Sequence, residues 1–196
     1  MKLGIVILAA GVSSRLGRAK QLLKWKGITF LERAVQLAQT VDSSILTVVI
    51  GAREAEVLPH VKDLGIPFCH NPDWSTGMGS SVKTGINDLL LQKADLDAIL
   101  ILLSDQVLVD ELDLKKILQA YHSSSKTIIA AKYKEVIGVP VLFDKTWFEP
   151  LQQLDGEKGA GALVRQNPSA AMTINMPNAA FDIDTEADYQ CLLDRN

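Results

Sequence analysis

Runs of apolar residues without alternation recur along the chain. They cover residues 3–8, 45–50 and 98–103, and shorter runs lie at 66–70 and 127–131. A continuous apolar run of this kind is typical of a parallel strand that is covered on both faces of its sheet. We therefore predict a strand in each of these five segments.

Segments with helical spacing of apolar residues lie between these strands. The first follows Thr29, whose spacing to Glu32 has the form of a capping box. Further helices are predicted over 54–64 with a kink or break at Pro59, from residue 80 or 81, over 114–121, over 144–154 with an interruption at Pro150, after 156–161, and from about 186. Because strands alternate with helices, we expect right-handed βαβ units in a single α/β domain over 1–196 with a mostly parallel sheet.

Two later segments also have strand character. Residues 172–176 form the last strand-like run, and residues 138–143 form another that contains Pro140. Since proline has no N–H to donate to a central ladder, this segment is predicted to be an edge strand, a bulge or a rim that faces the substrate.

Length, charge and cysteine content narrow the class of protein. The chain has 196 residues and a formal net charge of -3, which favours one domain and disfavours nucleic acid as the partner. Cys69 and Cys191 lie far apart without metal-ligand spacing, which favours reduced thiols. Met1 and Lys2 lead directly into the first strand, and no apolar run reaches the roughly 18 residues of a membrane span. We expect a cytoplasmic protein with no membrane partner.

Small residues and then cations follow the first strand. Residues 9–11 read Ala-Ala-Gly, which keeps side-chain bulk low and lets a ligand approach backbone N–H groups. Arg15, Arg18 and Lys20 come next, and such cations suit phosphate oxygens. The glycine spacing matches neither a P-loop nor a dinucleotide fingerprint. The alternative interpretation is an ordinary βα loop with solvated basic residues.

Polar groups also occur after two other strands, where open α/β sheets bind ligands. Ser80 and Ser81 open a helix, and a helix start offers free N–H groups, although an N-cap role alone also explains the serines. Asp105 follows strand 98–103 almost directly. An unpaired carboxylate is costly there, so a metal ion or a cation is the expected partner, and a solvated turn aspartate is the alternative.

Two aspartates near the end of the chain point to a hard metal. Asp182 and Asp184 alternate on a strand-like segment, so their side chains are expected to converge on one cation; the alternative for each is exposure to water. With Asp105 they provide three oxygen ligands, which suit Mg²⁺ together with substrate phosphates. The three histidines share no ligand spacing, and no Ser-His-Asp set is apparent. The remaining route is in-line attack of an acceptor oxygen on a nucleotide α-phosphorus.

The residues after the first strand resemble the signature Leu-Ala-Ala-Gly-x-Ser-x-Arg-Leu/Phe-Gly-x-x-Lys of MobA-like nucleotidyltransferases. The matching positions are Leu8, Ala9, Ala10, Gly11, Ser13, Arg15, Leu16, Gly17 and Lys20. The resemblance implies a three-layer α/β/α Rossmann-like nucleotidyltransferase domain of the GT-A-like type. It also implies that residues 8–11 bind the nucleotide, and that Arg15 and Lys20 act in catalysis by neutralising charge on the departing pyrophosphate.

Other motifs of the family match later positions. Residues 81–86 look like the Ser-Val-x-x-Gly-Leu stretch with which a related transferase group reads a pyrimidine, which implies nucleotide binding by Gly79, Ser80 and Ser81. Asp105 resembles the aspartate of a magnesium-binding Gly-Asp-Gln-Pro segment, although the residues before and after Asp105-Gln106 depart from it. In the family, one of two aspartates in the segment that resembles 182–184 completes this metal site, and spacing does not decide which.

Two residues are implied in acceptor binding by the same resemblance. Pro140 lies in a segment similar to the family's Gly-x-Pro-Val-Leu-Phe, and Lys158 lies in one similar to Gly-Asp-Lys-Gly-Ala-Arg, which borders the second substrate. A surface lysine is the alternative for Lys158. Gly161 replaces the arginine of that motif, which leaves the identity of the acceptor open.

Within the family, the chain looks most like molybdenum cofactor cytidylyltransferases. Ala10 stands where guanylyl members usually have glycine, which favours CTP over GTP. The resemblance implies Mg²⁺-dependent transfer of CMP from CTP to the phosphate of a molybdopterin-type cofactor, with release of pyrophosphate and transient contact with a molybdoenzyme. Two alternatives stay open: a sugar or alditol phosphate as the acceptor, and a non-catalytic molybdenum cofactor carrier or chaperone.

Overall fold

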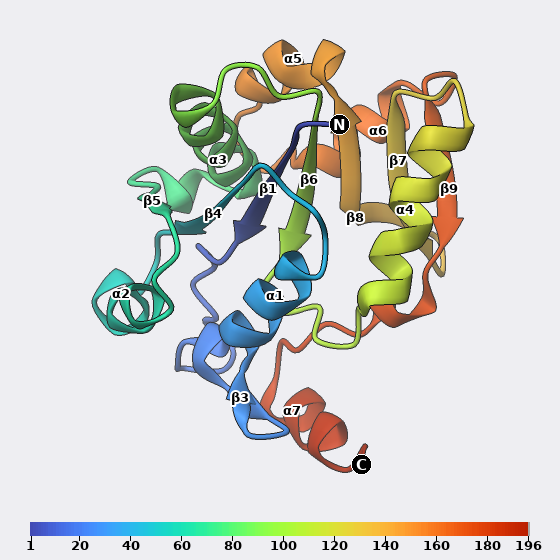
Figure 1. Ribbon diagram of the computed structural model, residues 1–196. Helices are drawn as coiled ribbons and strands as arrows, with labels where there is room; N and C mark the ends of the chain where they lie inside the picture. Colours follow the sequence, from blue (N-terminus) through green and yellow to red (C-terminus); the bar gives the residue numbers. More distant parts are fainter. Residues whose placement is uncertain (196) are drawn as a thin grey trace.

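The computed structural model describes residues 1–195 and contains a seven-stranded sheet (Figure 1). Its strands, in sheet order, are β5 (Phe68–His70), β4 (Ile45–Ile50), β1 (Leu3–Leu8), β6 (Ala98–Leu103), β8 (Val136–Asp144), β7 (Ile128–Tyr133) and β9 (Ala171–Asn175). β8 runs antiparallel to both of its neighbours, and the other strand pairs of this sheet are parallel. The prediction of a mostly parallel sheet is confirmed.

Helices cover both faces of the sheet. α1 (Phe30–Gln39), α2 (Glu54–Asp63) and α4 (Glu111–Ser123) pack on one face, and α3 (Met78–Gln92), α5 (Phe148–Gln152) and α6 (Ala160–Gln166) pack on the other. Short 3-10 turns complete the connections: η1 (Lys20–Leu22), η2 (Trp74–Thr76), η3 (Lys145–Trp147) and η4 (Pro177–Ala180). This three-layer α/β/α arrangement is the fold that the sequence predicts. None of the helices in residues 1–195 is both long and apolar enough to cross a bilayer.

The strand and helix bounds differ from prediction mainly at their ends. β5 is shorter than the predicted strand, and α3 begins at Met78, two residues before Ser80. α2 continues through Pro59, because Val57 and Val61 on either side of it are buried against the sheet. The predicted helix over 144–154 is divided into η3 and the short helix α5.

The strand that contains Pro140 is internal. β8 lies between β6 and β7, so the edge-strand alternative is wrong. The register between β7 and β8 shifts at Ala130 and Ala131, and neither Val139 nor Pro140 is paired in either ladder. This irregularity confirms the bulge alternative, because a bulge tolerates the missing N–H of proline.

A small separate core attaches the C-terminal segment to the sheet. Its buried members come from the hairpin of β2 (Lys24–Trp25) and β3 (Ile28–Thr29), the segment after β6, α1 and the region of α7 (Glu186–Leu193): Leu23, Trp25, Phe30, Val107, Ile183 and Leu192. Leu16 of the loop after β1 packs against the same core. As a result, α7 lies beside the hairpin, and the segment before it passes the carboxyl ends of β1 and β6 (Figure 1).

Candidate functional site

The loop after β1 directs its carbonyl groups toward protein donors. The side-chain amide of Gln21 donates to the carbonyls of Ala9 and Gly11, at 2.7 and 3.0 Å. The N–H of Ala52 donates to the carbonyl of Ala10 at 3.1 Å. Within residues 1–195, the N–H groups of Ala10 and Gly11 have no acceptor. The loop therefore presents donors and not acceptors to a ligand, which suits an anion or a base carbonyl.

A pocket of about 350 Å³ lies between this loop, the segment that precedes α3, and the end of β6. Its apolar wall includes Trp74, Met78 and Leu103. Of the residues predicted to bind nucleotide or catalyse transfer, it is lined by Leu8, Ala9, Ala10, Gly11, Lys20, Ser81 and Asp105. The structure thus brings three distant segments of the chain to one cavity, which has the size and mixed polarity of a small-ligand site.

A second hollow of about 230 Å³ adjoins the first. It is lined by residues 11–16, Lys20 and Asp184, and it shares Gly11, Val12 and Lys20 with the larger pocket. The mostly apolar pocket thus opens on one side toward cations. This division suits a base and ribose in the larger pocket and phosphates in the smaller one.

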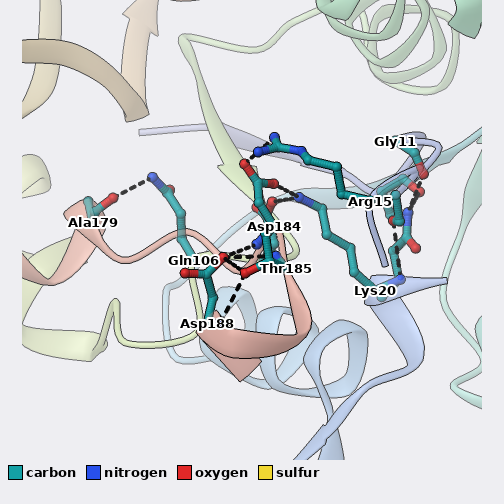
Figure 2. Close-up of polar contacts among 12 residues, drawn as sticks. Gly11, Arg15, Lys20, Gln106, Ala179, Asp184, Thr185 and Asp188 are labelled. Atoms are coloured by element: carbon teal, nitrogen blue, oxygen red, sulfur yellow. Dashed lines mark hydrogen bonds and ion pairs between the residues drawn. The ribbon is translucent and has the colours of Figure 1, made fainter. Parts of the chain in front are cut away.

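Lys20 lies at the centre of a charged cluster (Figure 2). Its ammonium contacts the carboxylate of Asp105 and lies 3.2 Å from Asp184 Oδ1. Arg15 donates to Asp184 Oδ2 at 2.6 Å. Burial disfavours the charged ammonium, but the carboxylates of Asp105 and Asp184 outweigh burial and raise the pKa of Lys20. Lys20 is therefore a cation held in place between two segments that are far apart in sequence.

Asp182 has the opposite electrostatic character. Desolvation by the surrounding protein is the main effect that raises the pKa of the Asp182 carboxyl to about 6, and repulsion from Asp105 adds to it. Attraction to Lys20 offsets only part of this increase. A carboxylate disfavoured in this way gains from a nearby cation. Asp182 would thus gain from a divalent ion, and Asp105 is the neighbouring carboxylate that repels it.

The predicted set of three metal ligands is not preformed. In residues 1–195, no group of three or more His, Cys, Asp or Glu side chains is arranged to hold a metal ion. Asp184 pairs with Arg15 and Lys20 instead. The donor set nevertheless fits a hard divalent ion, because Mg²⁺ commonly takes one or two carboxylates and completes its shell with phosphate and water oxygens. Asp105 and Asp182 would supply those carboxylates.

The segment that carries Asp184 is anchored by a capping box at the start of α7. Asp188 Oδ2 accepts from the N–H and the hydroxyl of Thr185, at 2.8 and 2.7 Å, and from the N–H of Asp184 at 3.2 Å. These hydrogen bonds lower the pKa of the Asp188 carboxyl. Arg18 adds a second link, with a 2.7 Å ion pair to Glu186. The helix start therefore fixes the backbone beside the catalytic candidates.

Gln106 is a structural residue whose role the sequence pattern alone does not reveal. It is buried, and its amide donates to the carbonyls of Val139 and Ala179, at 2.9 and 3.1 Å (Figure 2). It thereby connects the end of β6 to the bulge in β8 and to η4. The partners lie 33 and 73 positions away, so no local signal could identify them.

Four other predicted residues, which are Gly79, Ser80, Pro140 and Lys158, do not line the larger pocket. A side chain on Gly79 would meet the carbonyl of Asp155 at 2.7 Å and that of Lys158 at 2.9 Å, so Gly79 permits close packing of the 155–158 loop. The Ser80 hydroxyl faces protein carbonyls and not the cavity. Pro140 lines a separate small cavity behind the end of β6. The carbonyl of Lys158 lies close to Gly79 at the start of α3, and Lys158 is not among the residues that line the larger pocket.

Known proteins are similar to this chain over most of its length. A family model described as "MobA-like NTP transferase domain" matches residues 5–171. The chain is 35% identical over 82 residues to the molybdenum cofactor cytidylyltransferase of Escherichia coli (strain K12), and this alignment spans 41% of the chain and only 42% of that protein. It is 27% identical over 198 residues to the nicotine blue oxidoreductase of Paenarthrobacter nicotinovorans, which covers 96% of the chain and 95% of that protein.

A solved structure extends the comparison to three dimensions. The crystal structure of Rv0371c from Mycobacterium tuberculosis H37Rv in complex with manganese is similar to this chain with a TM-score of 0.78. The identity is 24%, and the match covers 100% of both chains. At this identity the likeness supports the fold and not the substrate.

Proposed function

This chain belongs to the MobA-like NTP transferase family and is a nucleotidyltransferase of that family, and from this premise we propose that it is a Mg²⁺-dependent cytidylyltransferase. In the proposed reaction, CMP passes from CTP to the terminal phosphate of a molybdopterin-type cofactor. The partial similarity to the molybdenum cofactor cytidylyltransferase of Escherichia coli supports this choice of substrates, and so does Ala10 in the loop after β1.

The observation that carries the proposal is the convergence of Lys20, Asp105 and Asp184 at the mouth of a pocket whose loop offers free N–H groups. A nucleotide bound there would present its triphosphate to Arg15 and Lys20. The same triphosphate would complete the ligand shell of an ion on Asp105 and Asp182. A bound Mg²⁺ would add electrostatic stabilisation of the charge on the reacting phosphates.

The reaction needs no covalent intermediate. An oxygen of the acceptor phosphate attacks the α-phosphorus of CTP, a new P–O bond forms, and the bond from the α-phosphorus to the oxygen that bridges it to the β-phosphorus breaks. Negative charge then accumulates on the departing pyrophosphate. Arg15 and Lys20 neutralise this charge, and the N–H groups of Ala10 and Gly11 hold the nucleotide in position.

Two residues outside the lining of the larger pocket are proposed to receive or position the acceptor. Lys158 belongs to the 155–158 loop, which packs against the start of α3, and its ammonium is proposed to bind the acceptor's phosphate. Pro140 is proposed to position the acceptor through the bulge of β8. A molybdoenzyme is proposed to take up the product by transient contact.

A substrate screen tests the proposal. Pyrophosphate release is measured with CTP, GTP and ATP, each combined with molybdopterin-type cofactor or with a panel of sugar and alditol phosphates, in Mg²⁺. We expect release with CTP and the cofactor. Preference for GTP would contradict the choice of nucleotide, and preference for a sugar phosphate would contradict the choice of acceptor. Tight binding of cofactor without release would support a carrier.

A further inference from the structure

Asn71 is a buried polar residue that contacts Ser81 of the larger pocket and that the proposed reaction does not use. It follows β5, and its side chain is 1% exposed. Its backbone N–H donates to the carbonyl of Ile50 at 2.8 Å, which fixes it to the end of β4. A buried amide of this kind requires partners, because an unsatisfied polar group costs about 1–3 kcal/mol.

The partners of Asn71 determine which way its amide faces. The backbone N–H of Asp73 is a donor and lies 3.0 Å from Asn71 Oδ1, so the oxygen must face Asp73. The nitrogen Nδ2 then faces the first turn of α3. It donates to the hydroxyl oxygens of Ser80 and Ser81, both at 2.9 Å.

The two serines differ in where their own protons go. The Ser80 hydroxyl donates to the carbonyl of Asp73 at 2.9 Å or of Gly77 at 2.8 Å. The Ser81 hydroxyl accepts from Asn71 and has no acceptor for its proton within residues 1–195, and Ser81 lines the pocket. The Asn71 amide already donates a hydrogen bond to the Ser81 oxygen. The Ser81 hydroxyl proton is therefore the part of this group that can bind a ligand.

Ser81 lines the larger pocket but not the adjoining hollow, and Lys20 is shared by the two. Trp74 and Met78 line the larger pocket with Ser81, whereas the adjoining hollow is lined by residues 11–16, Lys20 and Asp184. With phosphates at the cations, the nucleobase is the part of the ligand that meets Ser81. Cytosine presents acceptors at O2 and N3, whereas uracil presents a donor at N3.

We propose that Asn71 is a specificity-determining positioning residue, which holds the Ser81 hydroxyl as a hydrogen-bond donor toward the N3 acceptor of a cytosine base. This inference rests on the proposed binding of CTP in the larger pocket. It adds that the polarity of one hydroxyl, set by a buried amide that does not touch the base, separates cytosine from uracil.

Asn71→Asp tests the inference directly. The substitution preserves shape but replaces the donating nitrogen with an acceptor, and the N–H of Asp73 and the hydroxyls of Ser80 and Ser81 can all donate to the introduced carboxylate. The Ser81 proton then turns toward the carboxylate, and its oxygen lone pairs face the base. We expect the CTP:UTP ratio of affinities, measured calorimetrically with Mg²⁺, to fall by about tenfold, the scale of one hydrogen bond.

The ratio is the appropriate readout because an added negative charge weakens both nucleotides alike. Ser81→Ala should lower the same ratio, and Asn71→Asp should change it little further in the Ser81→Ala background, since Asn71 acts through Ser81. Ser80→Ala is the matched control. It removes the other hydroxyl held by Asn71, so it should lower the melting temperature and keep the ratio.

Two results separate the possible failures. If wild-type protein binds CTP, and both Asn71→Asp and Ser81→Ala retain its CTP:UTP ratio, the inference is overturned while the proposed function stands. If wild-type protein binds no nucleoside triphosphate, the proposed function falls and the inference falls with it. Should Asn71→Asp not fold, the ratio for Ser81→Ala decides alone.

Discussion

Arg15 and Asp184, which are 169 positions apart in the sequence, form a hydrogen-bonded ion pair of 2.6 Å. The pair joins the loop after β1 to the segment before α7, and Lys20 joins Asp184 to Asp105 at the end of β6. Three segments that are far apart in the sequence thereby share one network of charges.

Arg15→Ala should lower turnover far more than stability. The Arg15 side chain is 66% exposed, so its ion pair contributes little to folding. In the reaction, loss of a cation that neutralises the leaving pyrophosphate should reduce kcat by about 100-fold. Arg18→Ala is the matched control, because Arg18 also pairs with the C-terminal segment but lines neither hollow. If Arg18→Ala lowered kcat as much as Arg15→Ala does, the assignment of Arg15 to the leaving pyrophosphate would be contradicted.

Asp105→Asn should nearly abolish turnover at every Mg²⁺ concentration. The substitution removes the carboxylate shared by Lys20 and the proposed metal ion, and several kcal/mol of barrier reduction depend on such a charge. Initial rates over a Mg²⁺ titration provide the measurement, and circular dichroism checks the fold. Full activity of Asp105→Asn in excess Mg²⁺ would refute the metal assignment.

Asp182→Asn should stabilise the metal-free protein above pH 6. The folded-state pKa of about 6 lies above the ordinary value of 3.8, so the folded protein holds this proton more tightly than the unfolded chain. The contribution of the Asp182 carboxyl to the free energy of unfolding is therefore fully present below about pH 4, and it is lost as the pH rises through 6. After allowance for solvent screening, we expect the variant to gain about 1 kcal/mol at pH 7.5.

Thermal unfolding in EDTA from pH 4 to 8 measures this difference. Addition of Mg²⁺ should then stabilise wild-type protein more than Asp182→Asn, since the variant lacks one of the proposed ligands. Melting temperatures that differ equally at pH 4 and pH 7.5 would show that the carboxyl has no unusual proton affinity.

Gln21→Leu should weaken nucleotide binding through the loop backbone. The substitution leaves the carbonyls of Ala9 and Gly11 without their donor, which should cost about 1–3 kcal/mol and free the loop to turn those carbonyls toward the ligand. CTP affinity should fall at least tenfold. If Gln21→Leu bound CTP with wild-type affinity, the hydrogen bonds of Gln21 to the loop carbonyls would not be what orients the free N–H groups.

Much of this architecture could be predicted because its signals are local. The apolar runs that form β1, β4 and β6 match the structure residue for residue, and the capping box at Thr29 marks a true helix start. The β2–β3 hairpin has only two residues in each strand, which is too short for a periodic pattern.

The residues that the sequence did not reveal have partners in other elements of the fold. Gln106 reaches Val139 and Ala179, and Asn71 reaches the start of α3, so their roles depend on tertiary contacts that spacing cannot show. The place of Pro140 likewise depended on where β7 pairs with β8. By contrast, the first loop was identified because its small residues and cations are adjacent in sequence.

Transfer of the α-phosphate tests the proposed reaction most directly. Protein, Mg²⁺ and the molybdopterin-type cofactor are incubated with CTP labelled either at the α-phosphate or at the γ-phosphate. We predict that the α label appears in the cofactor product and that the γ label is released as pyrophosphate, with both signals lost in EDTA. Absence of the α label from the cofactor, while the protein is folded and binds both ligands, would contradict nucleotidyl transfer to this acceptor.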